Sequence, residues 1–146
     1  MRIWHKNLIP ILPREQLVAQ WRELSAIAGA VQKNGTPNHT LVNFILDYDF
    51  DHFISYAKAI REEMTFRGYR TSDAVWDKIV SLKPDWNEIS FVNIYKEKFN
   101  DFYFMICLNN LMEKISTGSI TEQPYTDKII QMYNYSTNAE NLKYIR

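Results

Sequence analysis

Apolar residues recur at spacings of three and four along one long stretch near the start of the chain. Between Leu12 and Lys33 these positions fall on a single helical face, formed by Leu17, Trp21, Leu24, Ala28 and Val31. Pro13 suits a first helical turn, where its missing N–H is not needed. Asn34-Gly35 follows the last periodic residue and is a typical helix stop. The pattern predicts a long amphipathic helix around which the fold is built.

The opposite side of this helix carries a strip of small residues. Ala19, Ala26 and Ala30 form the strip, and Arg22 and Glu23 lie on its two borders. A smooth groove with a cation on one side and a carboxylate on the other suits a bound ligand. The alternative is that Arg22 and Glu23 belong to an ordinary solvated face, and the pattern leaves both interpretations open.

The segments around this helix show weaker patterns. Met1–Leu12 is expected to be extended, because prolines at positions 10 and 13 oppose a helix there. His39–Leu46 resembles a short apolar helix. A helix over 51–67 is capped by Asp49 or Asp51 and ends at Gly68.

The second half of the chain contains one strong helical pattern. Lys98–Ser116 has a wide apolar stripe, which predicts a central place in the core. Ser72 is expected to cap a shorter helix that ends before Pro84. A last helix is expected over 121–133, and residues 90–95 could form a short strand. Together the patterns predict an all-α fold, in which residues 1–146 form a single compact domain of five or six helices.

Composition excludes several classes of protein. The single cysteine, Cys107, rules out an intrachain disulfide or a thiolate zinc cluster, and its apolar neighbours predict a buried thiol. Asp47, Asp49 and Asp51 alternate, but His52 stands where a calcium loop needs glycine. We expect no metal site and no cofactor. No apolar run approaches the length of a membrane span, and no secretion signal is present, which predicts a cytoplasmic protein.

Charge distribution gives modest support for an anionic partner. The chain has 17 basic and 17 acidic residues, so its formal net charge is zero. Residues 1–36, however, hold five basic side chains against two acidic ones, an excess that suits a phosphate-facing surface. Ordinary scatter of surface charge is the alternative.

Several motifs of the long helix and its lead-in are shared with a known family. The helix carries Gln16-Leu17, Ala19, Trp21, Arg22-Glu23-Leu24, Gly29-Ala30-Val31 and Lys33. The chain opens with Met1-Arg2-Ile3-Trp4-His5, followed by Leu8-Ile9-Pro10 and Leu12-Pro13-Arg14, and it later contains Glu62-Glu63-Met64 and Arg67-Gly68-Tyr69. These residues resemble the pyrimidine-dimer DNA glycosylases (the phage endonuclease V family) and, more closely, small bacterial relatives of those enzymes. The resemblance is most specific over residues 1–33 and extends to about residue 70.

The resemblance implies a DNA repair glycosylase with abasic-site lyase activity. In that family the α-amino group attacks deoxyribose C1′ to form an imine, and a carboxylate assists β-elimination. Carried over, the nucleophile would be the amine of Met1 and the carboxylate would be Glu23. A free α-amine, with a pKa of about 7.7–8.0, has an appreciable neutral fraction at pH 7 and is therefore a natural imine-forming nucleophile.

The resemblance also suggests a set of DNA contacts. Arg22 would hold a phosphate, with further contacts from Arg2, His5, His39 and Lys33. The expected partner is damaged double-stranded DNA, bound by a bacterial or phage-encoded monomer. For His5 the alternative is a structural hydrogen bond, and for His39 it is capping of a loop.

Two departures from the phage pattern bear on activity. The phage enzymes lose their initiator Met and expose a Thr, whereas Arg2 is too large to allow removal of Met1, so Met1 is expected to carry the amine. Ala26 replaces a basic residue of the phage enzymes, and their aromatic tail is only echoed in Tyr133, Tyr135 and Tyr144. The alternatives are therefore an inactive nucleic-acid- or protein-binding module on the same fold, and a small enzyme acting on another aldehyde or nucleotide.

Overall fold

The segment before the first long helix lies at the centre of the molecule. In the computed structural model, which describes residues 1–138, Lys6–Ile11 form the 3-10 helix η1. The prediction of an extended lead-in was wrong. Pro10 removes one backbone donor, but bonds from Leu8 N–H to the His5 carbonyl and from Leu12 N–H to the Ile9 carbonyl still close the turns.

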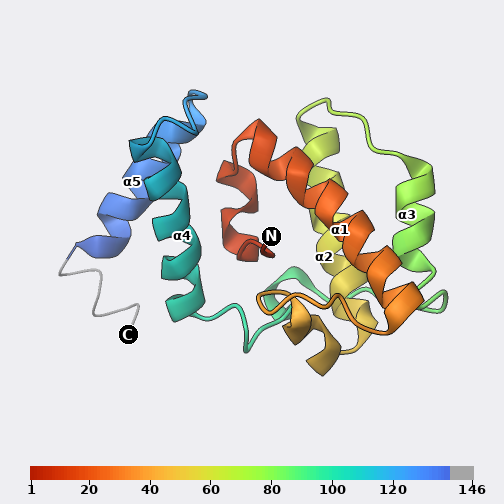
Figure 1. Ribbon diagram of the computed structural model, residues 1–146. Helices are drawn as coiled ribbons and strands as arrows, with labels where there is room; N and C mark the ends of the chain where they lie inside the picture. Colours follow the sequence, from red (N-terminus) through yellow and green to blue (C-terminus); the bar gives the residue numbers. More distant parts are fainter. Residues whose placement is uncertain (139–146) are drawn as a thin grey trace.

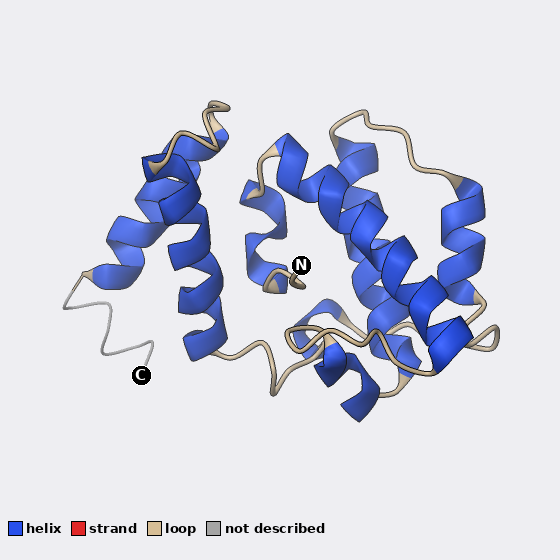
Figure 2. Ribbon diagram, viewed as in Figure 1, coloured by secondary structure: helices blue, strands red, loops and turns tan. Residues whose placement is uncertain are grey.

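The remaining elements of residues 1–138 are all helical, and Figure 2 shows no strand among them. The all-α prediction is therefore confirmed, and the strand considered for residues 90–95 is wrong. The α-helices are α1 (Arg14–Asn34), α2 (Phe50–Phe66), α3 (Asp73–Val80), α4 (Asp101–Ser116) and α5 (Tyr125–Thr137), and the other 3-10 helices are η2 (Asn43–Asp47) and η3 (Phe91–Asn93). None of these helices is both long and apolar enough to cross a membrane.

The long helix forms as the apolar pattern predicted. All five residues of the predicted apolar face of α1 are buried, and Trp21 is only 4% exposed. Pro13 occupies the N-cap position. Gly35 ends the helix in the left-handed conformation, with φ of 75°, and its N–H donates to the Val31 carbonyl. An L side chain at this position would be strained, which explains the Asn-Gly stop.

Two capping predictions for the next helices are confirmed. The Asp49 carboxylate accepts the N–H of Asp51 at the start of α2. The Ser72 hydroxyl accepts the N–H of Val75 in the first turn of α3. Helices α1, α2 and α3 pack on one another on one side of η1 (Figure 1).

Helix α4 does not occupy the central position that its apolar stripe suggested. It packs against α5 and η1 at the other side of the molecule (Figure 1). Two members of its stripe face solvent, with Phe102 77% and Ile106 36% exposed, whereas Cys107 is buried as predicted. The central place belongs instead to the lead-in, whose Ile3 and Leu8 are fully buried. This happens because η1 contacts α2, α4 and α5 and so fills the space between the two helical groups.

Candidate functional site

A cleft of about 780 Å³ opens at the amino terminus. It lies where the first residues of the chain meet the first half of α1 and one side of α4, and the amino terminus is seen between these two helices in Figure 1. The residues lining it are Met1, Arg2, Trp4, Arg14, Glu15, Gln16, Val18, Ala19, Arg22, Glu23, Leu41, Asn110 and Lys114. A volume of this size is within the usual range for small-molecule sites and could admit part of a nucleotide.

Glu23 is the partly buried carboxylate of this cleft. Burial raises the pKa of its carboxyl group above the usual value of 4.5. The positive amino terminus opposes this rise most strongly, followed by Arg22 and then His39. The amino terminus is therefore the strongest cationic influence on Glu23.

A buried amide connects the carboxylate to the start of the chain. Gln20, one helical turn before Glu23, has no exposed surface. Its Nε2 donates to the Arg2 carbonyl at 3.0 Å and to Glu23 Oε2 at 3.3 Å. Its Oε1 accepts the N–H of Trp4 at 2.9 Å. Gln20 thus links the amino-terminal backbone to Glu23 through its hydrogen bonds to both.

Positive side chains outnumber negative ones around the cleft. The cations are Arg2, Arg14, Arg22 and Lys114, and the carboxylates are Glu15 and Glu23. Within residues 1–138, neither Arg22 nor Lys114 forms an ion pair with another side chain. These cations are therefore available to an anionic ligand.

The structure brings four of the predicted site residues together in this cleft: Met1, Arg2, Arg22 and Glu23. Met1 is 48% exposed, and Arg22 is also exposed. Arg2 is only partly exposed, because its guanidinium lies 5.9 Å from the centroid of the Trp4 ring. Its charge also opposes the rise that burial causes in the pKa of Tyr103. Arg2 thus contributes to the cleft wall while packing against the protein interior.

The other three predicted DNA contacts do not line the cleft. Both ring nitrogens of His5 are engaged, since Nδ1 accepts the Asn7 N–H and Nε2 donates to the Phe99 carbonyl at 2.9 Å. His5 is 3% exposed, and this arrangement corresponds to the structural alternative. Lys33 is exposed in the last turn of α1, on the cleft-distant half of the helix.

His39 lies outside the cleft lining but close enough to influence it. Its positive form would lower the pKa of Glu23. Its Nδ1 accepts the N–H of Leu41, a residue that does line the cleft. This bond is the loop-capping role that the sequence left as an alternative.

The strip of alanines on α1 does not form a groove. Of its three members only Ala19 lines the cleft, while Ala26 and Ala30 lie outside it. The cleft is formed instead by the amino-terminal half of α1 facing the chain start and α4. Helix periodicity locates a strip on a cylinder, but it carries no information about which neighbour covers each end of that strip.

Sequence reasoning missed several residues of this site. Asn110 and Lys114 are separated by one helical turn and project from α4 into the cleft. Gln16 also lines it, with a buried Oε1 that has no hydrogen-bond partner among residues 1–138. The available signal for Gln20 was a polar residue within an apolar stripe. No such signal marks Asn110 or Lys114, because polar residues on the outer side of a helix are common.

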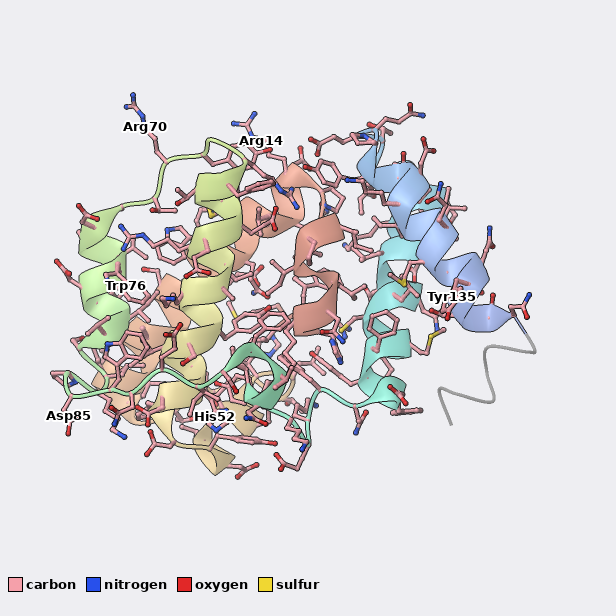
Figure 3. All side chains as sticks on the ribbon, turned by 180° about the vertical axis from the view of Figure 1, so that it is seen from behind. Arg14, His52, Arg70, Trp76, Asp85 and Tyr135 are labelled. Atoms are coloured by element: carbon pink, nitrogen blue, oxygen red, sulfur yellow. The ribbon has the colours of Figure 1, made fainter. Side chains whose placement is uncertain are left out.

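The aromatic residues of the last segment add little to the cleft. Tyr135, which is labelled in Figure 3, lies on α5 and is 62% exposed. Tyr133 is partly buried against the core, and Tyr144 lies outside the described residues. Neither Tyr133 nor Tyr135 lines the cleft.

No group of metal-ligating side chains is found within residues 1–138. The nearest sequence candidates, Asp49 and Asp51, both contact the Lys83 ammonium instead. The cleft is thus formed by an amine, a carboxylate, amides and cations. Such a set suits polyanion binding and proton transfer at a carbonyl or imine carbon.

The motifs of the cleft agree with a comparison against protein families. The family model of the pyrimidine dimer DNA glycosylases matches residues 1–77, which include all of α1 and α2. The chain belongs to this family. Enzymes of the pyrimidine dimer DNA glycosylase family repair DNA by glycosylase chemistry, and DNA is their substrate. No curated protein and no solved structure shows significant similarity to the chain.

The region matched by the family model contains part of the cleft lining. Met1, Arg22 and Glu23 all lie within residues 1–77. Asn110 and Lys114, which form the facing wall, lie beyond it. The cleft is therefore completed by residues that lie outside the region matched by the family model.

Proposed function

We propose that this protein is a glycosylase and abasic-site lyase that acts on damaged double-stranded DNA of the pyrimidine-dimer type. The observation that carries the proposal is the single cleft that holds an α-amine, the partly buried carboxylate of Glu23 and several cations. These are the groups that imine chemistry on a DNA sugar requires. No metal or cofactor takes part in this scheme.

The proposed nucleophile is the α-amine of Met1. Its nitrogen forms a bond to C1′, and the damaged base leaves with the electron pair of the broken glycosidic bond and takes up a proton. Opening of the sugar ring at O4′ then gives an imine between Met1 and C1′. The positive amino terminus lowers the pKa of the Glu23 carboxyl more than any other charge does, and this supports the role, because both groups must act on the same sugar.

Glu23 is proposed to be the general base of the strand-breaking step. Its carboxylate removes a proton from C2′, and the phosphate on C3′ leaves as the C3′–O bond breaks. Partial burial, which raises the pKa of the Glu23 carboxyl, makes its carboxylate a stronger base than an exposed one. The nearby amine, converted to a cationic imine, keeps the carboxylate ionised until the proton is transferred.

Arg22 and Arg2 are proposed to hold phosphates beside the attacked sugar. Arg22 is exposed and free of ion pairs within the described chain, so its guanidinium can donate two hydrogen bonds to one phosphate. His39 and Lys33 would contact DNA only beyond the cleft. His5, with both ring nitrogens engaged, could contribute only through the backbone that it positions.

Borohydride trapping on abasic-site duplex DNA tests the proposal. The imine is reduced to a stable amine, which leaves protein covalently joined to DNA. A preparation with a free Met1 amine should be trapped, and the cross-link should map to the peptide that contains Met1. Adding one uncleaved Gly before Met1 displaces the amine by up to about 3.8 Å and should abolish trapping.

The outcome also separates the proposal from a binding module without turnover. A C-terminal tag serves as the control and should leave trapping unchanged. A cross-link at Lys6 or Lys114 would assign the nucleophile to a side chain instead. DNA binding without any trapping would favour the module.

A further inference from the structure

We propose that Gln20 is a positioning residue that holds the amino-terminal backbone and the Glu23 carboxylate in one fixed arrangement. This inference rests on the proposed function, since it assigns to both groups a role on the same sugar. Gln20 does not itself line the cleft. It would act only through the two groups to which it is hydrogen-bonded.

The orientation of the Gln20 amide is fixed by the backbone. The Trp4 N–H can only donate, so the atom that faces it is the oxygen Oε1. The Arg2 carbonyl can only accept, so the atom that faces it is the nitrogen Nε2. The amide therefore cannot flip without losing both bonds. In this orientation Nε2 directs an N–H toward Glu23.

The four contacts of Gln20 span three separate parts of the chain. Nε2 joins the Arg2 carbonyl to the Glu23 carboxylate, and Oε1 joins the Trp4 N–H to the hydroxyl of Tyr56 on α2 at 2.9 Å. The Tyr56 hydroxyl also donates to the Trp4 carbonyl at 2.7 Å. Since Gln20 and Tyr56 are both fully buried, these bonds are shielded from water.

Burial of the Gln20 amide costs free energy unless the amide is hydrogen-bonded. A fully buried amide in an apolar stripe is tolerated only when its polar atoms are paired. A leucine at position 20 would continue the stripe but would leave the Trp4 N–H with one partner fewer and Glu23 without its neutral donor. The arrangement thus favours placement of the chain start over maximal apolar burial.

The titration of the Glu23 carboxylate gives a readout of its immediate surroundings, which loss of packing elsewhere in the protein would not move. The groups facing it are the amino terminus, Arg22 and His39 as charges and the Gln20 amide as a neutral donor. Arg2, Arg14, Glu15 and Lys114 lie around the same cleft. Because Gln20→Met changes no charge and nearly preserves the side-chain volume that buries Glu23, a shift in the Glu23 titration reports the lost hydrogen bond or a displaced amino terminus.

The experiment is carried out on the full chain labelled with ¹³C at glutamate Cδ, and the Glu23 signal is identified by its loss in Glu23→Gln. Gln20→Met keeps the side-chain length and removes the amide. We expect the titration midpoint of Glu23 to rise by about half a unit to one unit, the equivalent of one hydrogen bond. Single-turnover cleavage of abasic DNA should slow by about tenfold or more, with DNA affinity little changed.

Two further variants separate positioning from stability. Gln32→Met makes the same change on α1 at an exposed site outside the cleft, where the amide donates to Ser81 and to the Lys78 carbonyl, and it should leave the Glu23 midpoint and cleavage as in the wild type. Tyr56→Phe removes a buried hydroxyl but leaves the Nε2 bonds, so it should destabilise the fold without moving the Glu23 midpoint. A Glu23 midpoint unchanged in Gln20→Met, or shifted equally in Tyr56→Phe, would overturn the proposal.

Failure of this inference can be told apart from failure of the proposed function. If the wild type is not trapped by borohydride, the lyase mechanism is wrong, whereas the titration still tests whether Gln20 positions Glu23. If the wild type is trapped at Met1 and Gln20→Met is trapped and cleaves equally well, only the role of Gln20 is rejected.

Discussion

The guanidinium of Arg67, at the end of α2, donates to the carbonyl of Leu12 through Nη1 at 2.7 Å. Its Nη2 also lies within hydrogen-bonding distance of the carbonyls of Ile9 and Pro10. Glu63, one turn earlier, pairs with its Nε at 2.8 Å. Arg67 thus closes the carboxyl end of η1 and fixes the junction between η1 and α1.

This relationship predicts that Arg67→Met strongly destabilises the protein. The Arg67 side chain is only 6% exposed, and its removal leaves Glu63 as an unpaired, largely buried carboxylate. Loss of one partner of such a pair typically costs about 3–5 kcal/mol. Urea unfolding monitored by tryptophan fluorescence measures the change. Arg70→Met, at the exposed residue labelled in Figure 3, is the control and should be near neutral.

Substitution of the proposed base should separate binding from chemistry. Glu23→Gln keeps the shape of the side chain but removes the basic oxygen, so single-turnover strand cleavage should slow by about 10²–10⁴-fold. Affinity for abasic DNA should largely survive, since phosphate contacts dominate it. Glu62→Gln, on the exposed side of α2, provides the matched control. Unchanged cleavage by Glu23→Gln would remove this residue from the mechanism.

The raised pKa of Glu23 predicts the acidic limit of the lyase reaction. Burial shifts the carboxyl pKa upward from 4.5, so the group becomes protonated, and loses its basic form, at a higher pH than an exposed glutamate. Cleavage from the preformed imine should therefore decline as the pH falls through this raised value. Measuring the elimination rate against pH at constant ionic strength checks the direction. A decline only below 4.5 would contradict it.

Lys114 should contribute to DNA affinity although it lies outside the region that the family model matches. It lines the cleft opposite Arg22 and forms no ion pair within residues 1–138. Lys114→Ala should weaken binding and lower the slope of log K against log salt concentration by about 1, as expected for one lost phosphate contact. Fluorescence anisotropy over a salt series gives both values.

Substitutions of two other lysines provide a control and a test of the DNA path. Lys128→Ala, on the exposed side of α5, should leave the slope unchanged. Lys33→Ala tests whether DNA extends along α1 beyond the cleft. A slope reduced at Lys33 but not at Lys114 would move the DNA path away from α4.

The lowered pKa of the buried His5 imidazole predicts that stability depends on pH. Burial lowers the pKa of its imidazole from 6.5 to about 4, so the folded protein keeps this residue neutral. Between these two values the unfolded chain binds a proton that the folded chain does not, and stability falls as the pH decreases from about 6.5 toward 4. The loss amounts to about 3 kcal/mol over this window.

The contribution of His5 can be isolated by substitution. The imidazole of His52 also has a lowered pKa, from burial, and adds a dependence of the same sign. Unfolding curves of the wild type and His5→Asn at several pH values between 4 and 7 give the difference. Equal pH dependence in the two proteins would show that His5 does not titrate as predicted.

The sequence by itself determined the helices whose formation depends on local physics. The apolar face of α1 follows from a spacing of three and four, and its end at Gly35 follows from a backbone conformation that favours glycine. The caps at Asp49 and Ser72 likewise depend on neighbours only a few residues away. Residue identities also predicted, through the family motif, that Met1, Arg22 and Glu23 belong to one site, and all three line the same cleft.

Only the tertiary structure decided which surfaces meet. Nothing in the local pattern shows that the proline-containing lead-in would form the centre of the molecule, or that α4 would lie to one side with Phe102 exposed. Asn110 and Lys114 become cleft residues because η1, packed between the helical groups, holds α4 opposite α1. The bonds of Gln20 join residues separated by up to 36 positions, and no periodicity within one helix encodes such a contact.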